Sequence, residues 1–210
     1  MITTEDPRII RYPHPCKIHV RYEEMRIGDV WCTTSNLPIS VGIKRKTWGW
    51  GSMFSLEKCS HVGVVAQIGD QYFLVEALSK GITISTCYRY LNPGTLNGGL
   101  QVCAMMRHVN MDDKYRGFLN KQLIALAFDN VPYDTGGALE FQFPFLRESP
   151  LGLFCSEMAD VVYLNTEVSQ GLPSGELIIV QPARPSSKVT PMDFQMSRKM
   201  VDVSRRVVRG

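Results

Sequence analysis

The sequence lacks the long apolar segments of membrane proteins and exported precursors. No uninterrupted apolar run approaches the roughly 20 residues that a membrane-spanning helix needs. The first 15 residues carry acids, arginine and prolines where a signal peptide would need an apolar stretch. We therefore expect a cytoplasmic location by default, with a secreted effector and a virus-encoded protein as open alternatives.

Motifs for cofactors, metals and disulfides are absent as well. The sequence contains no P-loop, no G-x-S-x-G motif and no Rossmann fingerprint, and we expect no cofactor. Its six cysteines, at positions 16, 32, 59, 87, 103 and 155, form no C-x-x-C pair. Three of them lie in or beside predicted strands, so we expect reduced, mostly buried thiols and no metal site.

Net charge is small, but it is unevenly distributed. Residues 186–210 carry six basic and two acidic side chains, a net charge of +4, whereas the whole chain has +3. Such a tail could contact an anionic membrane or an acidic partner. Apolar residues at helical spacing also predict an amphipathic helix docked on its own domain: Met196, Met200, Val203 and Val207. We expect no specific nucleic-acid binding, and the sequence indicates no oligomeric state.

The organisation is that of one domain, residues 27–185, between a Pro-rich N-terminal arm (1–26) and the basic tail (186–210). Two apolar runs, the β-branched 62–68 and then 71–77, flank the turn dipeptide Gly69-Asp70 and predict a β-hairpin. Further strands are expected at 30–33, 81–86, 100–106 and 177–180, with helices at 112–128 and from Cys155. The expected architecture is α+β, a small antiparallel sheet or barrel packed against helices, with the strands from 62 to 106 in a meander.

Residues 34–58 read as a long loop with interleaved cations and aromatics. It is a candidate substrate loop for an anionic or lipid-like ligand, and the alternative is a merely solvated loop. Its candidate residues are Lys44, Lys46, Trp48 and Trp50.

The predicted hairpin brings a histidine and a carboxylate together. If Gly69-Asp70 is a two-residue loop, facing positions sum to 139, so that Gly63 faces Glu76. His61, Gly63 and Glu76 then share one face, with His61 and Glu76 as diagonal neighbours and Gly63 leaving that face uncovered. A carboxylate beside an imidazole fixes its tautomer and raises its basicity. The pair is therefore a candidate general base.

Cys155 is the candidate nucleophile. It follows a loop rich in proline and aromatics and opens a predicted helix, with Ser156 and Glu157 in the first turn. Free N–H groups and the helix dipole favour a thiolate there and can stabilise an oxyanion. The alternative is that Cys155 is one more buried structural thiol.

Four short segments occur in the order of a known family: Ser60–Val64, Phe73–Ala77, Pro132–Asp134 and Phe154–Glu157. This order resembles the circularly permuted NlpC/P60 branch of papain-like enzymes, which includes YiiX/YaeF-like proteins and is related to lecithin:retinol acyltransferases. In that branch histidine precedes cysteine. The resemblance implies a permuted papain-like fold with Cys155 as nucleophile, His61 as base and Glu76 as orienting residue. Tyr133, which the resemblance implicates, and Ser156 are candidates for lining the site or supporting an oxyanion.

The resemblance implies a cysteine amidohydrolase or peptidase that forms a thioester acyl-enzyme. Its substrates would be cell-wall-type peptide bonds or N-acyl amides. Acyl transfer or hydrolysis of a lipid or thioester is a second reading, because the same nucleophile serves both reactions. A non-catalytic module that binds a fatty acid or peptide is a third, and a structural role is a fourth.

Overall fold

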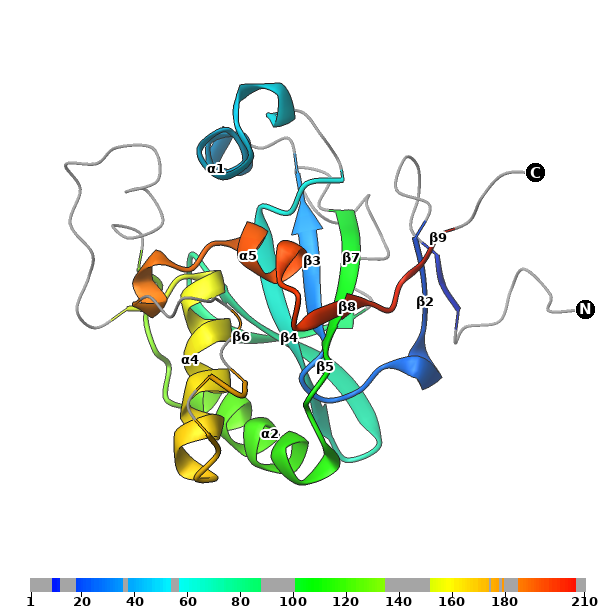
Figure 1. Ribbon diagram of the computed structural model, residues 1–210, viewed down its shortest axis with the longest axis vertical. Coiled ribbons are helices and arrows are strands. Elements are labelled where there is room, and N and C mark those ends of the chain that lie inside the picture. The colour runs from blue at the N-terminus through cyan, green and yellow to red at the C-terminus, as the bar shows by residue number, and fades with distance from the viewer. Residues whose placement is uncertain are drawn as a thin grey trace, which may run out of the picture.

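The structure is a computed structural model that describes residues 9–11, 18–35, 38–53, 57–87, 101–134, 152–173, 175–177, 179 and 185–206. Its centre is a six-stranded antiparallel sheet in the order β6-β5-β4-β3-β7-β8 (Figure 1). The strands are β3 (Val30–Thr34), β4 (His61–Ile68), β5 (Gln71–Leu78), β6 (Gly81–Thr86), β7 (Gln101–His108) and β8 (Met200–Asp202). The expected α+β class with an antiparallel sheet is confirmed.

The order of the strands differs from the expected meander. Of the four strands expected to form the meander, β4, β5 and β6 do so, whereas β7 lies beside β3, which separates it from β4. A bulge between Cys32 and Thr33 interrupts the pairing of β3 with β7. Hydrophobic patterning identified the strands but could not show their order, because β3 offers two edges and only tertiary packing decides which strand takes each.

The β4–β5 hairpin has the predicted register. Ile68 pairs with Gln71 and Val64 with Val75, so facing positions sum to 139. Gly69 has a φ of 59°, the left-handed conformation that a two-residue hairpin turn requires. This turn fixes which side chains share a face of the hairpin, including those of the candidate site.

The structure describes four α-helices: α1 (Pro38–Trp48), α2 (Asp113–Phe128), α4 (Cys155–Ser169) and α5 (Pro191–Met196). Three short 3₁₀ helices accompany them: η1 (Tyr22–Glu24), η2 (Trp50–Ser52) and η4 (Ser186–Lys188). Asp112 caps the start of α2, since its side chain accepts a hydrogen bond from the Tyr115 N–H at 2.9 Å. The predicted loop over 34–58 is wrong, because α1 and η2 occupy most of it.

The two ends of the chain are more structured than expected. In the N-terminal arm, β1 (Ile9–Arg11) and β2 (Ile18–Arg21) form a small sheet with β9 (Arg205–Arg206) from the tail (Figure 1). The long amphipathic helix expected in the tail is not formed. Met196 ends α5, Met200 begins β8, Val203 lies between β8 and β9, and Val207 lies outside the described residues. The expected strand at 177–180 lies partly outside the described residues, and Leu177 and Ile179 belong to no strand.

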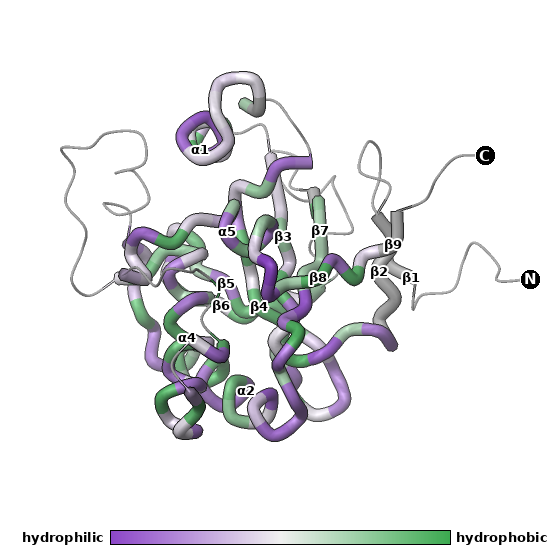
Figure 2. Tube along the Cα trace, viewed as in Figure 1, coloured by the Kyte–Doolittle hydropathy of each residue, from purple (hydrophilic) through white to green (hydrophobic). Residues whose placement is uncertain are grey.

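The sheet buries apolar residues on both faces. Alternate residues of β4 and β5, such as Val62, Val64 and Val75, pack with α2 and α4 in the larger core. Val65 and Leu74 point to the other face, where they pack against Trp31 and Met105. In Figure 2 the central strands and α4 are accordingly rich in apolar residues. This packing holds the first residue of α4 against the sheet.

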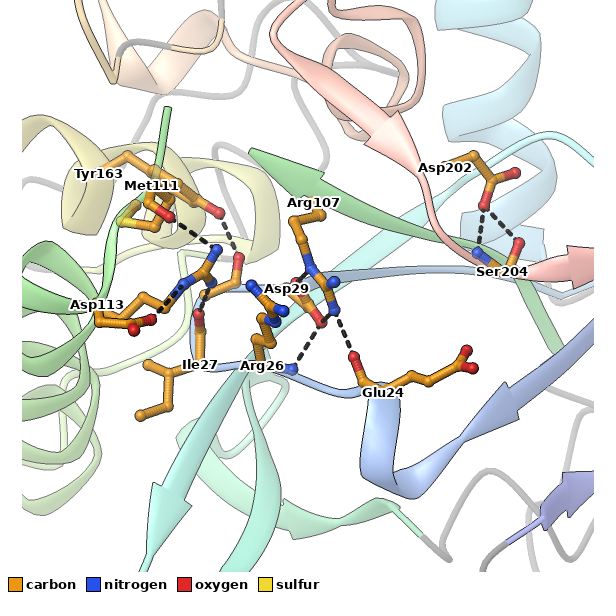
Figure 3. Close-up of polar contacts among 12 residues, drawn as sticks. Glu24, Arg26, Ile27, Asp29, Arg107, Met111, Asp113, Tyr163, Asp202 and Ser204 are labelled. Atoms are coloured by element: carbon orange, nitrogen blue, oxygen red, sulfur yellow. Dashed lines mark hydrogen bonds and ion pairs between the residues drawn. The ribbon is translucent and has the colours of Figure 1, made fainter. Parts of the chain in front are cut away.

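The turn that leads into β3 is fixed by a buried carboxylate (Figure 3). Asp29 is fully buried and accepts hydrogen bonds from Arg107 Nε at 2.8 Å and from a terminal nitrogen of the same guanidinium at 2.7 Å. It also accepts one from the Arg26 N–H at 2.8 Å. Asp29 is therefore more than the turn residue that its Gly-Asp context indicates. It ties the start of β3 to β7.

We expect Asp29→Ala to lower the free energy of unfolding by about 3 kcal/mol, because it leaves the Arg107 guanidinium without its buried partner. Urea denaturation followed by circular dichroism measures the change. Asp113→Ala is the matched control, since Asp113 lies 3.8 Å from Arg116 but is 99% exposed. That control should change stability by less than about 0.5 kcal/mol. Equal losses for the two variants would contradict the prediction.

Candidate active site

Cys155 is the first residue of α4, and the residue before it cannot cap the helix with its side chain. Phe154 has an extended backbone (φ −95°, ψ 174°) and makes no side-chain cap hydrogen bond. Instead, the Glu157 carboxylate accepts the Phe154 N–H at 3.4 Å. The Ser156 N–H, one of the unpaired donors of the first helical turn, is directed at the Cys155 sulfur, where it favours the thiolate.

A short parallel bridge places Tyr133 beside this helix start. Tyr133 pairs with Leu153, whose N–H donates to the Pro132 carbonyl at 3.1 Å and whose carbonyl accepts the Asp134 N–H at 3.3 Å. Gly152 is required for this approach, because a Cβ at that position would lie 2.8 Å from the Asp134 nitrogen. Burial, reinforced by the nearby Cys155, raises the pKa of Tyr133, which keeps its hydroxyl protonated and able to donate.

His61 and Glu76 meet as the hairpin register predicts. His61 Nε2 lies 2.9 Å from Glu76 Oε2, with Glu76 fully buried and the His61 side chain 14% exposed. With Nε2 bound to the carboxylate, Nδ1 is the ring nitrogen that remains for Cys155, with which His61 shares a hydrogen bond. The three side chains thus form a continuous chain of contacts from carboxylate to sulfur.

The site lies at the point where β4 and β5 stop pairing. β4 pairs with β3 from His61 onward, but with β5 only from Val64 onward. The Val62 N–H, in the part of β4 before that point, is directed at the Cys155 sulfur. Because strand separation exposes a backbone donor here, the thiolate is stabilised by both the sheet and the helix.

These contacts change the protonation of both members of the Cys155–His61 pair. Burial alone raises the pKa of the Cys155 thiol, but the charge and hydrogen bond of His61, with the N–H groups of Val62 and Ser156, bring that pKa below its ordinary value. Burial alone lowers the pKa of His61, whereas Cys155 and Glu76 together raise it to about 10. The arrangement favours a thiolate–imidazolium pair at neutral pH.

The other described cysteines are free, buried thiols of a different kind. Burial raises the pKa of Cys59 well above its ordinary value and that of Cys87 to about 12. A hydrogen bond to Cys59, together with burial, also raises the pKa of Cys103 well above the ordinary value. In Cys32 a hydrogen bond to Cys59 lowers the pKa, but burial together with the nearby Cys103, Asp202 and Cys155 raises it above the ordinary value. Cys16 lies outside the described residues.

The space above Gly63 is not open, contrary to expectation. A Cβ at Gly63 would lie 2.6 Å from Leu74 Cγ, so the Leu74 side chain fills the face that the glycine leaves. Leu74 is fully buried and belongs to the second core. Gly63 is therefore a packing requirement of the hairpin, and access to the site is not through it.

The remaining candidate residues are not gathered around the sulfur. The Ser156 hydroxyl is buried and donates to the Val189 carbonyl at 2.8 Å, so only its backbone faces Cys155. Lys44 is buried within α1, and its Nζ donates to the Ser35 carbonyl at 3.0 Å. It is therefore not presented to solvent as a loop residue would be. Lys46 and Trp50 are exposed, and Trp48 is half-buried.

Within the described ranges, none of the helices has the length and apolar character of a membrane span. No group of three or more histidine, cysteine, aspartate or glutamate residues there is placed to hold a metal ion.

Fold and site together define the class: an α+β protein in which a strand that carries a histidine precedes a helix that begins with a cysteine. The same fold is found in the crystal structure of the metalloprotein YiiX from Escherichia coli O157:H7. The TM-score is 0.58, with 14% sequence identity, over 85% of this chain and 96% of that one. The expected YiiX-like fold is thereby confirmed. No protein-family model and no curated protein matches the sequence.

The sequence predicted the N–H groups at the start of the Cys155 helix, but it did not indicate the other backbone contributions to the site. The Val62 N–H and the Tyr133–Leu153 bridge involve main-chain atoms, which leave no trace in residue identity. Gly152 is the one available signal, since a glycine beside a predicted helix start can mark a close backbone approach. The pattern around it did not show which segment approaches.

Proposed function

We propose that this chain is a cysteine hydrolase that cleaves an amide bond through a thioester acyl-enzyme. The observation that supports the proposal is the lowered pKa of Cys155 at the N-terminus of α4, beside a histidine whose Nε2 is bound to a buried carboxylate. The four other described thiols have raised pKa values. Nucleophilic catalysis needs such an activated group next to an oriented base.

The acylation step starts from the Cys155 thiolate and the His61 imidazolium. The Cys155 sulfur attacks the carbonyl carbon, and the negative charge moves to the carbonyl oxygen. The backbone N–H of Cys155 and the Tyr133 hydroxyl are the proposed donors to that oxyanion. His61 then gives its proton to the leaving amine, the C–N bond breaks, and a thioester forms on Cys155.

Deacylation returns the enzyme to its starting state. His61, now neutral, takes a proton from water, and the resulting hydroxide attacks the thioester carbonyl. The C–S bond breaks, the carboxylic acid leaves, and the thiolate is restored beside the imidazolium. Glu76 holds the ring throughout by accepting a hydrogen bond from Nε2–H, which leaves Nδ1 for proton transfer.

The proposed substrates are peptide amides of cell-wall type or N-acyl amides, in agreement with the resemblance of the motif order. A second candidate, acyl transfer or hydrolysis of a lipid or thioester, is favoured by the exposed aromatic and basic side chains of α1 and η2. The two reactions share the acylation step and differ in the acyl donor and acceptor. The site chemistry proposed above requires no metal ion.

Intact-mass spectrometry after incubation with peptidoglycan fragments, N-acyl amino acids, phospholipids or acyl thioesters tests the proposal. We expect a mass increase equal to one acyl group on the wild type, which neutral hydroxylamine removes because it cleaves thioesters. Cys155→Ala should acquire no such mass. If the wild type stays unmodified and binds one of these compounds as well as Cys155→Ala does, the protein is a binding module and the hydrolase proposal is overturned.

A further inference from the structure

The solvent side of α1 combines apolar and basic residues. Helical spacing places Ile39, Gly42, Arg45 and Lys46 on one side of α1, with the buried Lys44 opposite and the buried Ile43 at its edge. Ile39 is 37% exposed, and Trp50, in the following 3₁₀ helix, is 67% exposed. We call Ile39, Arg45, Lys46 and Trp50, with the adjacent Lys58, the α1 face.

Charge around the α1 face is mainly positive. Residues 38–58 contain four cations and one acidic residue, Glu57. Arg45 stacks on Trp50, with its guanidinium carbon 3.3 Å from the ring centroid, and Lys58 Nζ lies 4.3 Å from the centroid of the Trp48 ring. Arg45 and Lys58 are therefore held beside aromatic rings.

The α1 face is tied to the candidate active site. Trp48 Nε1 donates to the Cys59 carbonyl at 3.0 Å, two residues before His61. α1 also follows β3, whose Thr33 pairs with His61. In Figure 1, α1 lies at the top of the molecule, beyond the end of the sheet where β3 finishes. A surface that contacts α1 is therefore brought to the end of the sheet that carries the site.

We propose that the α1 face docks on the surface of an anionic lipid bilayer and so presents the site to membrane-borne substrate. Tryptophan favours the membrane–water interface, and a cationic residue beside it is attracted to anionic lipid headgroups. The proposal deepens the proposed function, since it assigns the place where the hydrolase meets its substrate. It commits to a bilayer because exposed Ile39 and Trp50 need an apolar region, which a soluble polyanion does not supply.

Sedimentation with vesicles of phosphatidylcholine, with and without phosphatidylglycerol, tests the docking. We expect wild-type protein to bind the anionic vesicles, with an affinity that falls as salt is raised, and to bind the neutral vesicles weakly. Trp50→Ala and Lys46→Glu should each weaken binding to anionic vesicles about ten-fold. Lys46→Arg keeps the charge and should bind as the wild type does.

Matched controls lie on α2, where Phe128 is 72% exposed and Lys121 is also exposed. Phe128→Ala and Lys121→Glu should bind vesicles as the wild type does. An equal loss in these controls, or no binding by the wild type, overturns the proposal. Capture of the wild type by soluble polyglutamate in place of anionic vesicles would assign the α1 face to an acidic polypeptide and equally overturn it.

The docking proposal and the hydrolase proposal are tested by different measurements. Cys155→Ala should bind anionic vesicles as the wild type does, whereas Trp50→Ala should keep a reactive Cys155. If vesicle binding is absent while Cys155 still forms an acyl-enzyme, only the docking is wrong. If vesicles bind through the α1 face while Cys155 stays inert, only the hydrolase is wrong.

Discussion

At pH 7, iodoacetamide is expected to alkylate Cys155 at least about 100-fold faster than Cys32, Cys59, Cys87 or Cys103. Only the thiolate reacts, and Cys155 is the described cysteine whose pKa is lowered. Its reactivity should persist below pH 7 and fall only as acid protonates the thiolate. The buried thiols, with raised pKa values, should react appreciably only when the protein unfolds. Peptide mapping of the alkylated cysteines at several pH values measures the rates.

His61 is the origin of this reactivity, and its substitution is the control. His61→Ala removes the largest influence that favours the thiolate, so the pKa of Cys155 should rise and alkylation at pH 7 should slow by about ten-fold or more. A Cys155 that reacts no faster than Cys59 in the wild type would refute the ion pair. Equal rates in the wild type and His61→Ala would instead show that the helix terminus alone activates the thiol.

Glu76→Gln should lower kcat by about 100-fold or more, a loss of roughly 3 kcal/mol in transition-state stabilisation. The amide keeps the shape of Glu76 but removes the negative charge that helps to raise the pKa of His61. The pH profile provides a second readout. Leaving-group protonation needs the imidazolium, so wild-type activity should fall as pH rises through about 10. In Glu76→Gln that alkaline limb should move to lower pH.

The shift of the alkaline limb distinguishes a positioning role for Glu76 from a purely structural one. Loss of fold would reduce activity at every pH and lower the melting temperature, without moving the limb. Glu23→Gln is the matched control, because Glu23 is exposed and lies far along the chain from the site. It should leave both kcat and the pH profile unchanged. An unmoved limb in Glu76→Gln would exclude the proposed link between the carboxylate and His61.

The hairpin and two of the helices could be predicted from the sequence because the residues that specify each of them are close together in the chain. Alternation along 62–68 and 71–77, split by Gly69-Asp70, predicted both the hairpin and its register. The start of α2 also depends on a local contact, because the Asp112 side chain accepts a hydrogen bond from Tyr115, only three residues later in the chain. The helix at Cys155 was likewise predicted from adjacent residues, namely the preceding loop rich in proline and aromatics and the first turn that follows. By contrast, α1 was read as a loop because Gly42 and Trp48 obscure helical spacing, and because its packing depends on Lys44 reaching the Ser35 carbonyl.

The sequence by itself determined that His61 and Glu76 would meet, since strand alternation and a two-residue turn leave one register. Only the tertiary structure decided that Cys155 joins them. Residues 76 and 155 are far apart in the chain, and the packing of α4 on β4 brings the helix terminus to the place where β4 leaves β5. That placement supplies the Val62 N–H and the charge of His61, which together overcome burial and lower the pKa of the thiol. A residue's identity carries no information about such neighbours, because they arise only when distant segments pack.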